Sequence, residues 1–159
     1  MVTRYGKLFK NLSTGSICYF SYDRNNDYYA FIQEMLRQGY RQCIITSDIM
    51  IKIIEHYVLS GNTEVISIDF MIEEDELKKD ISHLLELMKN NLGYWVVLKK
   101  RLSFLSKKDS IEIKKVSFRL KKGSGSLFKI YANGIIAVSE VTFDDVLESI
   151  SKIMEGYVK

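Results

Sequence analysis

The order of apolar and polar residues predicts alternating strands and helices in the N-terminal half of the chain. After a lead-in segment at 1–14, three short runs lack strongly polar interruptions, which is typical of strands buried on both faces. Each run precedes a segment with apolar residues at three- and four-residue spacing, the pattern of a half-buried helix. The predicted strands are 15–21, 42–47 and 64–69, and the predicted helices are 27–38, 49–59 and 73–91.

After Gly93 the pattern changes to β-hairpins and one closing helix. The stretch 111–120 alternates strictly between the two sides of a strand, and a glycine- and serine-rich turn at 123–126 follows it. A final helix is expected to begin at Thr142 or Phe143 and to end at Gly156. The predicted strands of this half are 94–101, 111–120, 128–131 and 134–138.

This order of elements predicts an α/β fold in one domain over residues 1–159. Repeated strand–helix units with buried strands indicate a parallel sheet with right-handed crossovers. The C-terminal hairpins would extend that sheet as an antiparallel meander at one edge. We therefore expect a three-layer sandwich around a mostly parallel central sheet.

The formal net charge of the chain is +3, but acidic and basic residues are distributed unevenly along the sequence. Acidic residues concentrate between 64 and 86, and basic residues concentrate between 99 and 122. Three interpretations stay open: two solvated faces, a basic strand surface for a polyanion, or head-to-tail docking of the basic side on the acidic side of a neighbour. The candidate residues for polyanion or partner binding are Lys99, Lys100, Arg101, Lys114, Lys115, Arg119, Lys121 and Lys122.

Three segments resemble the RecA-like P-loop ATPases, in particular their KaiC-like and RadB-like archaeal branch. The run Gly15-Ser-Ile-Cys-Tyr-Phe-Ser with the helix ending at Gly39 is similar to the opening of that family. Val65-Ile-Ser-Ile-Asp69 is similar to its Walker B strand, and the stretch from Trp95 to Gly134-Ile-Ile resembles its closing β-meander. The resemblance implies a reduced RecA-like domain and an ATPase relative or a second copy as partner.

The residues that bind phosphate in that family are replaced in this chain. A working loop needs glycines, a lysine and a Ser/Thr hydroxyl, whereas Tyr28 and Tyr29 stand at the lysine and hydroxyl positions. A phenol supplies no positive charge, so we expect no ATP hydrolysis and no cofactor. The segment at the nucleotide-loop position comprises Asp23, Arg24, Asn25, Asn26, Asp27, Tyr28 and Tyr29.

Other candidate chemistry is sparse. Asp69 stands where the Walker B acid would bind magnesium-bound water, or is an ordinary polar residue at a strand end. His56 and His83 lack zinc-ligand spacing, and Cys18 and Cys43 are interpreted as small buried hydrophobic residues. No apolar run reaches membrane-spanning length, and no secretory signal opens the chain, which favours a cytoplasmic protein.

Three functions stay open on the sequence. The first is a non-catalytic, RecA/KaiC-like interaction protein that binds itself or an ATPase relative. The second is a DNA-binding accessory factor in recombination or repair that uses the basic segment 99–122. The third is a ligand-sensing α/β signalling domain with a small molecule at the strand ends near Ser21, Ser47 and Asp69. A residual nucleotide-binding enzyme comes after these three.

Overall fold

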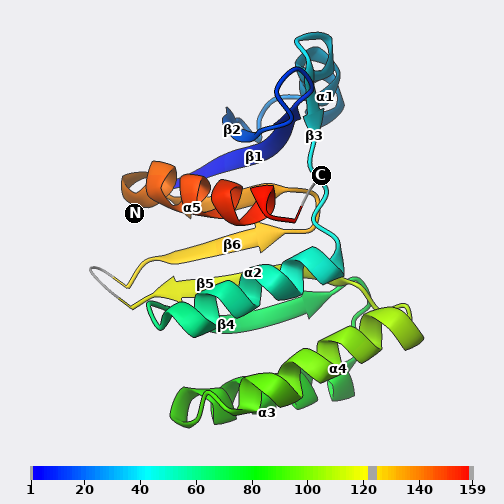
Figure 1. Ribbon diagram of the computed structural model, residues 1–159, viewed down its shortest axis with the longest axis vertical. Helices are drawn as coiled ribbons and strands as arrows, with labels where there is room; N and C mark the ends of the chain where they lie inside the picture. The colour runs from blue at the N-terminus through cyan, green and yellow to red at the C-terminus, as the bar shows by residue number, and fades with distance from the viewer. Residues whose placement is uncertain (1, 122–124, 158–159) are drawn as a thin grey trace. The chain divides into compact units, whose positions relative to one another are not determined.

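The computed structural model describes residues 2–121 and 125–157, which form two compact units (Figure 1). Unit 1 combines the two ends of the chain, 1–45 and 133–159, and unit 2 is the segment Thr46–Ala132 inserted between them. The predicted single domain thus contains two clusters of contacts, and each is described by itself.

Unit 1 is built around β1 (Thr3–Asn11), which pairs along both of its edges. One edge pairs with β2 (Ile17–Tyr22). The other edge pairs first with β7 (Ile135–Ser139) and then, further along β1, with β3 (Tyr40–Gln42). Two helices, α1 (Tyr28–Arg37) and α5 (Phe143–Glu155), complete the unit, and a short 3₁₀ turn at Glu140–Thr142 precedes α5.

The helices of unit 1 pack against opposite residue sets of β1. The ring of Phe31 on α1 contacts the buried ring of Phe9 edge-on, with centroids 5.7 Å apart. On the other side, Gly6 allows α5 to approach β1, because a Cβ there would lie 2.9 Å from Leu147 Cδ1. This alternation follows from the two-residue period of a strand.

Unit 2 is a three-stranded antiparallel sheet covered by helices. β5 (Ile113–Leu120) lies between β4 (Thr63–Phe70) and β6 (Leu127–Tyr131). α2 (Ser47–Ser60) packs on the apolar face of this sheet, where the Tyr57 ring lies 5.3 Å from Phe118 and 5.6 Å from Phe128 (Figure 1). α3 (Asp75–Asn90) also packs on β4, and α4 (Tyr94–Lys108) contacts both α2 and α3.

The predicted parallel RecA-like sheet is wrong. The seven strands among the described residues pair only in antiparallel fashion within each unit. The predicted lead-in 1–14 is the central strand β1, and the predicted strand at 64–69 pairs antiparallel with β5. The crossover rule applies only to parallel strands of one sheet, whereas here β2 and β3 pair antiparallel with β1, and β4 pairs antiparallel with β5.

Local predictions were confirmed for most other elements. The strands at 15–21, 64–69, 111–120, 128–131 and 134–138 and the helices at 27–38, 49–59, 73–91 and 142–156 correspond to observed elements. Of the predicted strand 42–47 only Gln42 is in a strand, as the last residue of β3, and the predicted strand 94–101 is helical. The turn predicted at 123–126 lies partly outside the described residues.

Candidate functional site

Acidic and basic segments of the sequence meet inside unit 2 and neutralise each other in part. Four cations of the basic segment each lie within ion-pair distance of an acid from α2, β4 or α3. The pairs are Lys99–Glu55 at 2.7 Å, Arg101–Asp80 at 3.1 Å, Lys115–Asp69 at 3.1 Å and Arg119–Glu64 at 3.9 Å. These cations do not form one continuous basic strand surface, because each has an acidic neighbour.

The residues of the basic segment divide between two elements. Lys99, Lys100 and Arg101 lie on α4 and not on a strand, which corrects their predicted placement. Lys115 and Arg119 lie on β5 with their acidic partners on β4, and Lys114 and Lys121 are exposed at the two ends of that strand region. Lys122 lies outside the described residues.

The inner side of α4 explains why this segment is helical. Trp95, Leu98, Leu102 and Leu105 are buried at three- and four-residue spacing, which places them on one side of a helix. Trp95 Nε1 donates a hydrogen bond of 2.8 Å to Glu55 Oε2 on α2, and Lys99 Nζ donates one of 2.7 Å to the same oxygen. These two hydrogen bonds hold the pKa of Glu55 below its ordinary value.

The outer side of α4 combines exposed apolar and cationic side chains. Val96, Val97 and Phe104 are 56%, 49% and 50% exposed. Lys100, Lys107 and Lys108 are also exposed, and none of them forms an ion pair within the part of the chain that the structure describes. We call the surface formed by Val96, Val97, Lys100, Phe104, Lys107 and Lys108 the α4 face.

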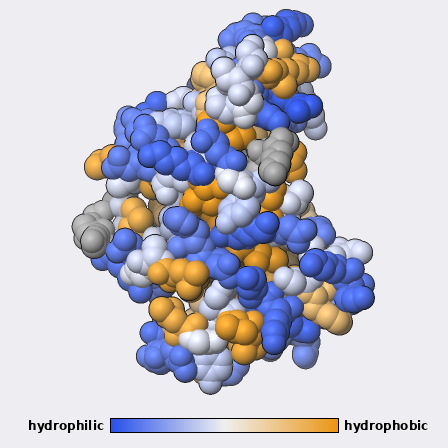
Figure 2. Space-filling model, in the orientation of Figure 1, coloured by the Kyte–Doolittle hydropathy of each residue, from blue (hydrophilic) through white to orange (hydrophobic). Residues whose placement is uncertain are grey.

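The composition of α4 makes this face strongly cationic. The segment 94–108 contains five lysine or arginine residues and no acidic residue. In the space-filling view, hydrophobic patches interrupt the hydrophilic surface in the region of unit 2 that carries α3 and α4 (Figure 2). A mixed surface of this kind suits a partner that offers both apolar contact and negative charge.

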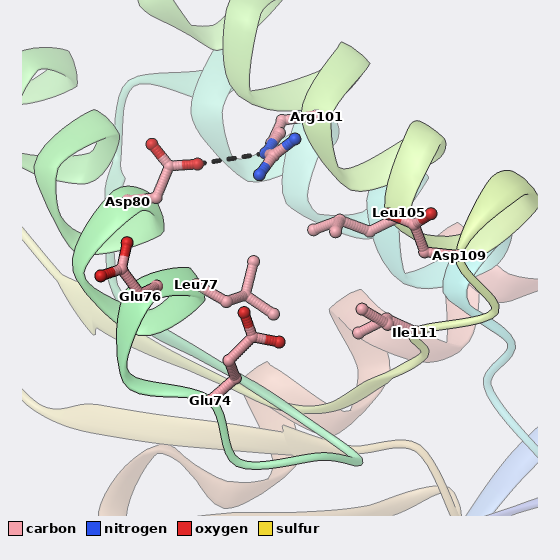
Figure 3. A pocket seen from close by; sticks show the side chains of 8 residues that line it. All are labelled: Glu74, Glu76, Leu77, Asp80, Arg101, Leu105, Asp109 and Ile111. Carbon is pink, nitrogen blue, oxygen red and sulfur yellow. Dashed lines mark hydrogen bonds and ion pairs between the residues drawn. The ribbon is translucent and has the colours of Figure 1, made fainter.

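An acidic pocket of about 450 Å³ lies between the start of α3 and the end of α4 (Figure 3). The side chains of Leu77, Leu105 and Ile111 are directed toward its middle. They come from α3, from α4 and from the segment before β5, so all three belong to unit 2. The floor of the pocket is therefore formed by apolar side chains, of which Leu77 and Leu105 are themselves buried.

The rim of this pocket carries most of its charge. Four carboxylates stand around the floor, and one cation, Arg101, donates from Nε to Asp80 Oδ2 at 3.1 Å. The four acids are Glu74, Glu76, Asp80 and Asp109. No group of three or more metal-ligating side chains is present among the described residues, so these acids are not arranged around a metal position.

The predicted nucleotide-loop segment forms the turn between β2 and α1. Asp27 caps α1: its Oδ1 accepts hydrogen bonds from the backbone nitrogens of Tyr29 and Ala30 at 2.9 and 3.2 Å. Asp23 Oδ1 accepts from Asn25 N at 2.9 Å, and the Asn26 nitrogen donates to the Asp23 carbonyl. The helix N-terminus is therefore occupied by a side chain of this chain.

The remaining residues of that segment contact other parts of unit 1. Arg24 donates to the Tyr5 hydroxyl at 2.8 Å and lies over the Tyr5 ring. Tyr28 donates to Gln42 Oε1 at 3.0 Å and stacks on Tyr29, which is 82% exposed. The lysine and hydroxyl positions of the family resemblance are thus parts of an aromatic cluster beside β3.

The structure also contains a buried lysine that the sequence analysis did not identify. Lys7 is 1% exposed in the middle of β1, and its ammonium donates to the carbonyls of Asn133 and Cys43. Burial lowers the pKa of Lys7 to about 8. Gly134 has φ +83°, and a Cβ there would lie 3.0 Å from the ammonium and 2.2 Å from the Cys43 carbonyl oxygen.

The sequence contains a signal for the helix α4 but not for the burial of Lys7. The spacing of Trp95, Leu98, Leu102 and Leu105 is helical, but the β-branched pair Val96 and Val97 favoured a strand. A single lysine within an apolar run, as at Lys7, gave no comparable signal. Cys18 and Cys43 are free thiols, half-buried and buried.

No family model, curated protein or solved structure matches this chain. Each helix of the described residues is too short or too polar to cross a bilayer.

Proposed function

We propose that this chain is a non-catalytic interaction protein that docks an acidic partner protein on the α4 face. The observation that carries the proposal is the combination of three half-exposed apolar side chains with three cations that form no ion pair with the described residues. Lys99, Arg101, Lys115 and Arg119 are paired with acids of unit 2, but Lys114 and Lys121 are also exposed without an ion pair among the described residues, so charge alone would not select this face.

The apolar side chains favour a protein partner over a nucleic acid. A phosphate backbone would pair with Lys100, Lys107 and Lys108 but would leave Val96, Val97 and Phe104 facing water. A protein surface with an apolar centre and acidic rim can cover both kinds of side chain, which is the arrangement of protein–protein interfaces. Burying apolar area contributes about 25 cal/mol per Å².

Two further observations support a non-catalytic role. The only titratable groups whose pKa values move far from their ordinary values are Lys7 and Tyr19 among the described residues, and neither lines a described pocket. Asp27 caps the helix end at which a phosphate would bind in a nucleotide-binding protein.

The test uses a fluorescent, amphipathic acidic peptide with glutamate on one side and leucine on the other. We expect the wild-type protein to bind it, and we expect the K100E/K107E variant to bind at least about tenfold more weakly, equivalent to about 1.4 kcal/mol. Phe104→Ala should weaken binding as well. The control K79E/K152E changes net charge equally but alters α3 and α5, and it should bind as the wild type does.

Fluorescence anisotropy with a DNA duplex of the same label provides the opposing outcome. Preferential binding of DNA that is lost in K100E/K107E but retained in Phe104→Ala would overturn the protein-partner proposal in favour of a DNA-binding role. Equal binding of the peptide by all variants would show that the α4 face is not the docking surface.

A further inference from the structure

We propose that the occupant of the α4 face is the acidic pocket of a second copy of this chain, so that copies associate head to tail. This inference rests on the proposed function, because it names the partner of the same face. It is carried by the complementarity of two described surfaces of unit 2, the α4 face and the acidic pocket, of which Figure 3 shows the pocket.

The two surfaces have the same layout with opposite charge. In the pocket, an apolar floor of Leu77, Leu105 and Ile111 stands inside a rim of carboxylates. On the α4 face, the half-exposed ring of Phe104 stands among lysines. Lys100 precedes Phe104 by four residues and Lys107 and Lys108 follow it by three and four, so all three are its neighbours on the helix surface.

The size of the pocket is compatible with an aromatic side chain. Its volume of about 450 Å³ is within the range of roughly 300–1,000 Å³ that holds small ligands, which is sufficient for one phenylalanine ring. Three lysines of the incoming helix would then lie near Glu74, Glu76, Asp80 and Asp109 of the receiving copy. Arg101 already pairs with Asp80, so the other three carboxylates are the available partners.

A single copy cannot fill its own pocket in this way. Phe104 and Leu105 are consecutive on α4 and therefore point about 100° apart around the helix axis. Leu105 is directed into the pocket, and Phe104 is directed to solvent. The contact must come from another copy. Where it is not returned by the same partner it is heterologous, and its repetition produces rings or open chains.

The experiment is a sedimentation analysis of reversed-charge variants of the full chain. The variant K100E/K107E loses the α4 face and keeps the acidic pocket, whereas E74K/E76K loses the pocket and keeps the face. We expect the mean mass of the wild type to rise with concentration and each variant alone to sediment as a monomer. An equimolar mixture of the two variants should form a heterodimer and nothing larger, because only one intact pair of surfaces remains.

Two controls test whether a loss of association results from a folding defect or from a general change in net charge. Circular dichroism and the emission of Trp95, the single tryptophan, report whether each variant is folded. A second charge control, R41E/K152E, changes the net charge equally but alters only unit 1 and should self-associate as the wild type does. Added salt should weaken association by screening the rim charges.

The possible results distinguish the proposed function from head-to-tail association. If E74K/E76K binds the acidic peptide while the wild type stays monomeric and the mixture forms no heterodimer, the proposed function stands and head-to-tail association is overturned. If the peptide is not bound either, both are overturned. A heterodimer that forms from the mixture alone supports the inference directly.

Discussion

Lys7 is a charged residue that is buried among apolar residues of β1. Its neighbours Leu8 and Phe9 are fully buried, and the ammonium is satisfied by two backbone carbonyls rather than by an acid. Both carbonyls lie close to the points where the chain leaves unit 1 at Ile45 and returns at Asn133. The lysine therefore ties both crossing points to β1.

Lys7→Met should remove a pH dependence of stability. Lys7 has a pKa of about 8 in the folded protein and 10.5 ordinarily, so between these values the unfolded chain binds more protons. The free energy of unfolding of the wild type should therefore rise from pH 8 to pH 10.5, by up to about 3 kcal/mol from this group. Urea unfolding of wild type and variant across this range gives the difference.

The comparison with the variant isolates Lys7 from other groups. Burial raises the pKa of Tyr28, which opposes the rise in both proteins and cancels in the difference. Burial also raises the pKa of Cys43, but the charge of Lys7 lowers it, so the difference reports Lys7 together with its effect on Cys43. Lys10→Met on the same strand is the matched control and should keep the wild-type profile. A pH-independent difference between Lys7→Met and wild type would show that Lys7 does not titrate in this range.

At the scale of elements, the local sequence pattern predicted a helix or strand correctly where tertiary packing favours the same secondary structure. Helix α1 was predicted correctly, because its apolar spacing is helical and Gly39 follows its end with φ +92°. Helix α4 was predicted as a strand, because Val96 and Val97 favour extended structure. The burial of Trp95 and the leucines of its inner side against α2 and α3 overrides that preference.

Removal of the α1 cap tests the role assigned to the turn 23–27. Asp27→Ala should lower the free energy of unfolding by about 1 kcal/mol, because two backbone nitrogens of the first turn lose their acceptor. Asp27→Ser retains an acceptor oxygen and should stay within a few tenths of a kcal/mol of the wild type. Chemical denaturation measures both, and equal stability of all three proteins would contradict the capping role.

At the scale of the whole molecule, strand pairing decides which ligand sites are possible. A nucleotide site of the P-loop type requires a parallel sheet whose strands end at one edge beside a free helix N-terminus. Here the strands of each unit pair antiparallel and Asp27 occupies the N-terminus of α1. Asp69 lies on β4, whose partner β5 supplies Lys115 as its ion-pair partner at 3.1 Å.

We therefore expect magnesium ATP and magnesium ADP to leave the Tm of the protein unchanged. A bound nucleotide at a concentration of about 100 times its Kd would add about 2.7 kcal/mol to the free energy of unfolding, which a thermal-shift titration detects readily. A magnesium-dependent rise in Tm that disappears in Arg24→Ala would contradict this expectation and would locate a phosphate site in the turn after β2.

The candidate binding surface was foreseen only in part. The sequence located the cations of the basic segment and raised head-to-tail docking as one interpretation of the charge distribution. It did not identify which cations are free, because Glu55, Asp80, Asp69 and Glu64 reach their partners only through contacts between elements. The apolar part of the α4 face was missed because its segment was expected to form a strand.

The sequence by itself determined the position of most helices and strands, because periodicity, caps and glycines act over a few neighbouring residues. Tertiary structure alone decided the strand partners, since β1 pairs with β2 beside it and with β7 from the other end of the chain. It also decided the helical state of α4, the burial of Lys7 and the pairing of charges. Each of these depends on free-energy terms between residues far apart in sequence, which no local pattern records.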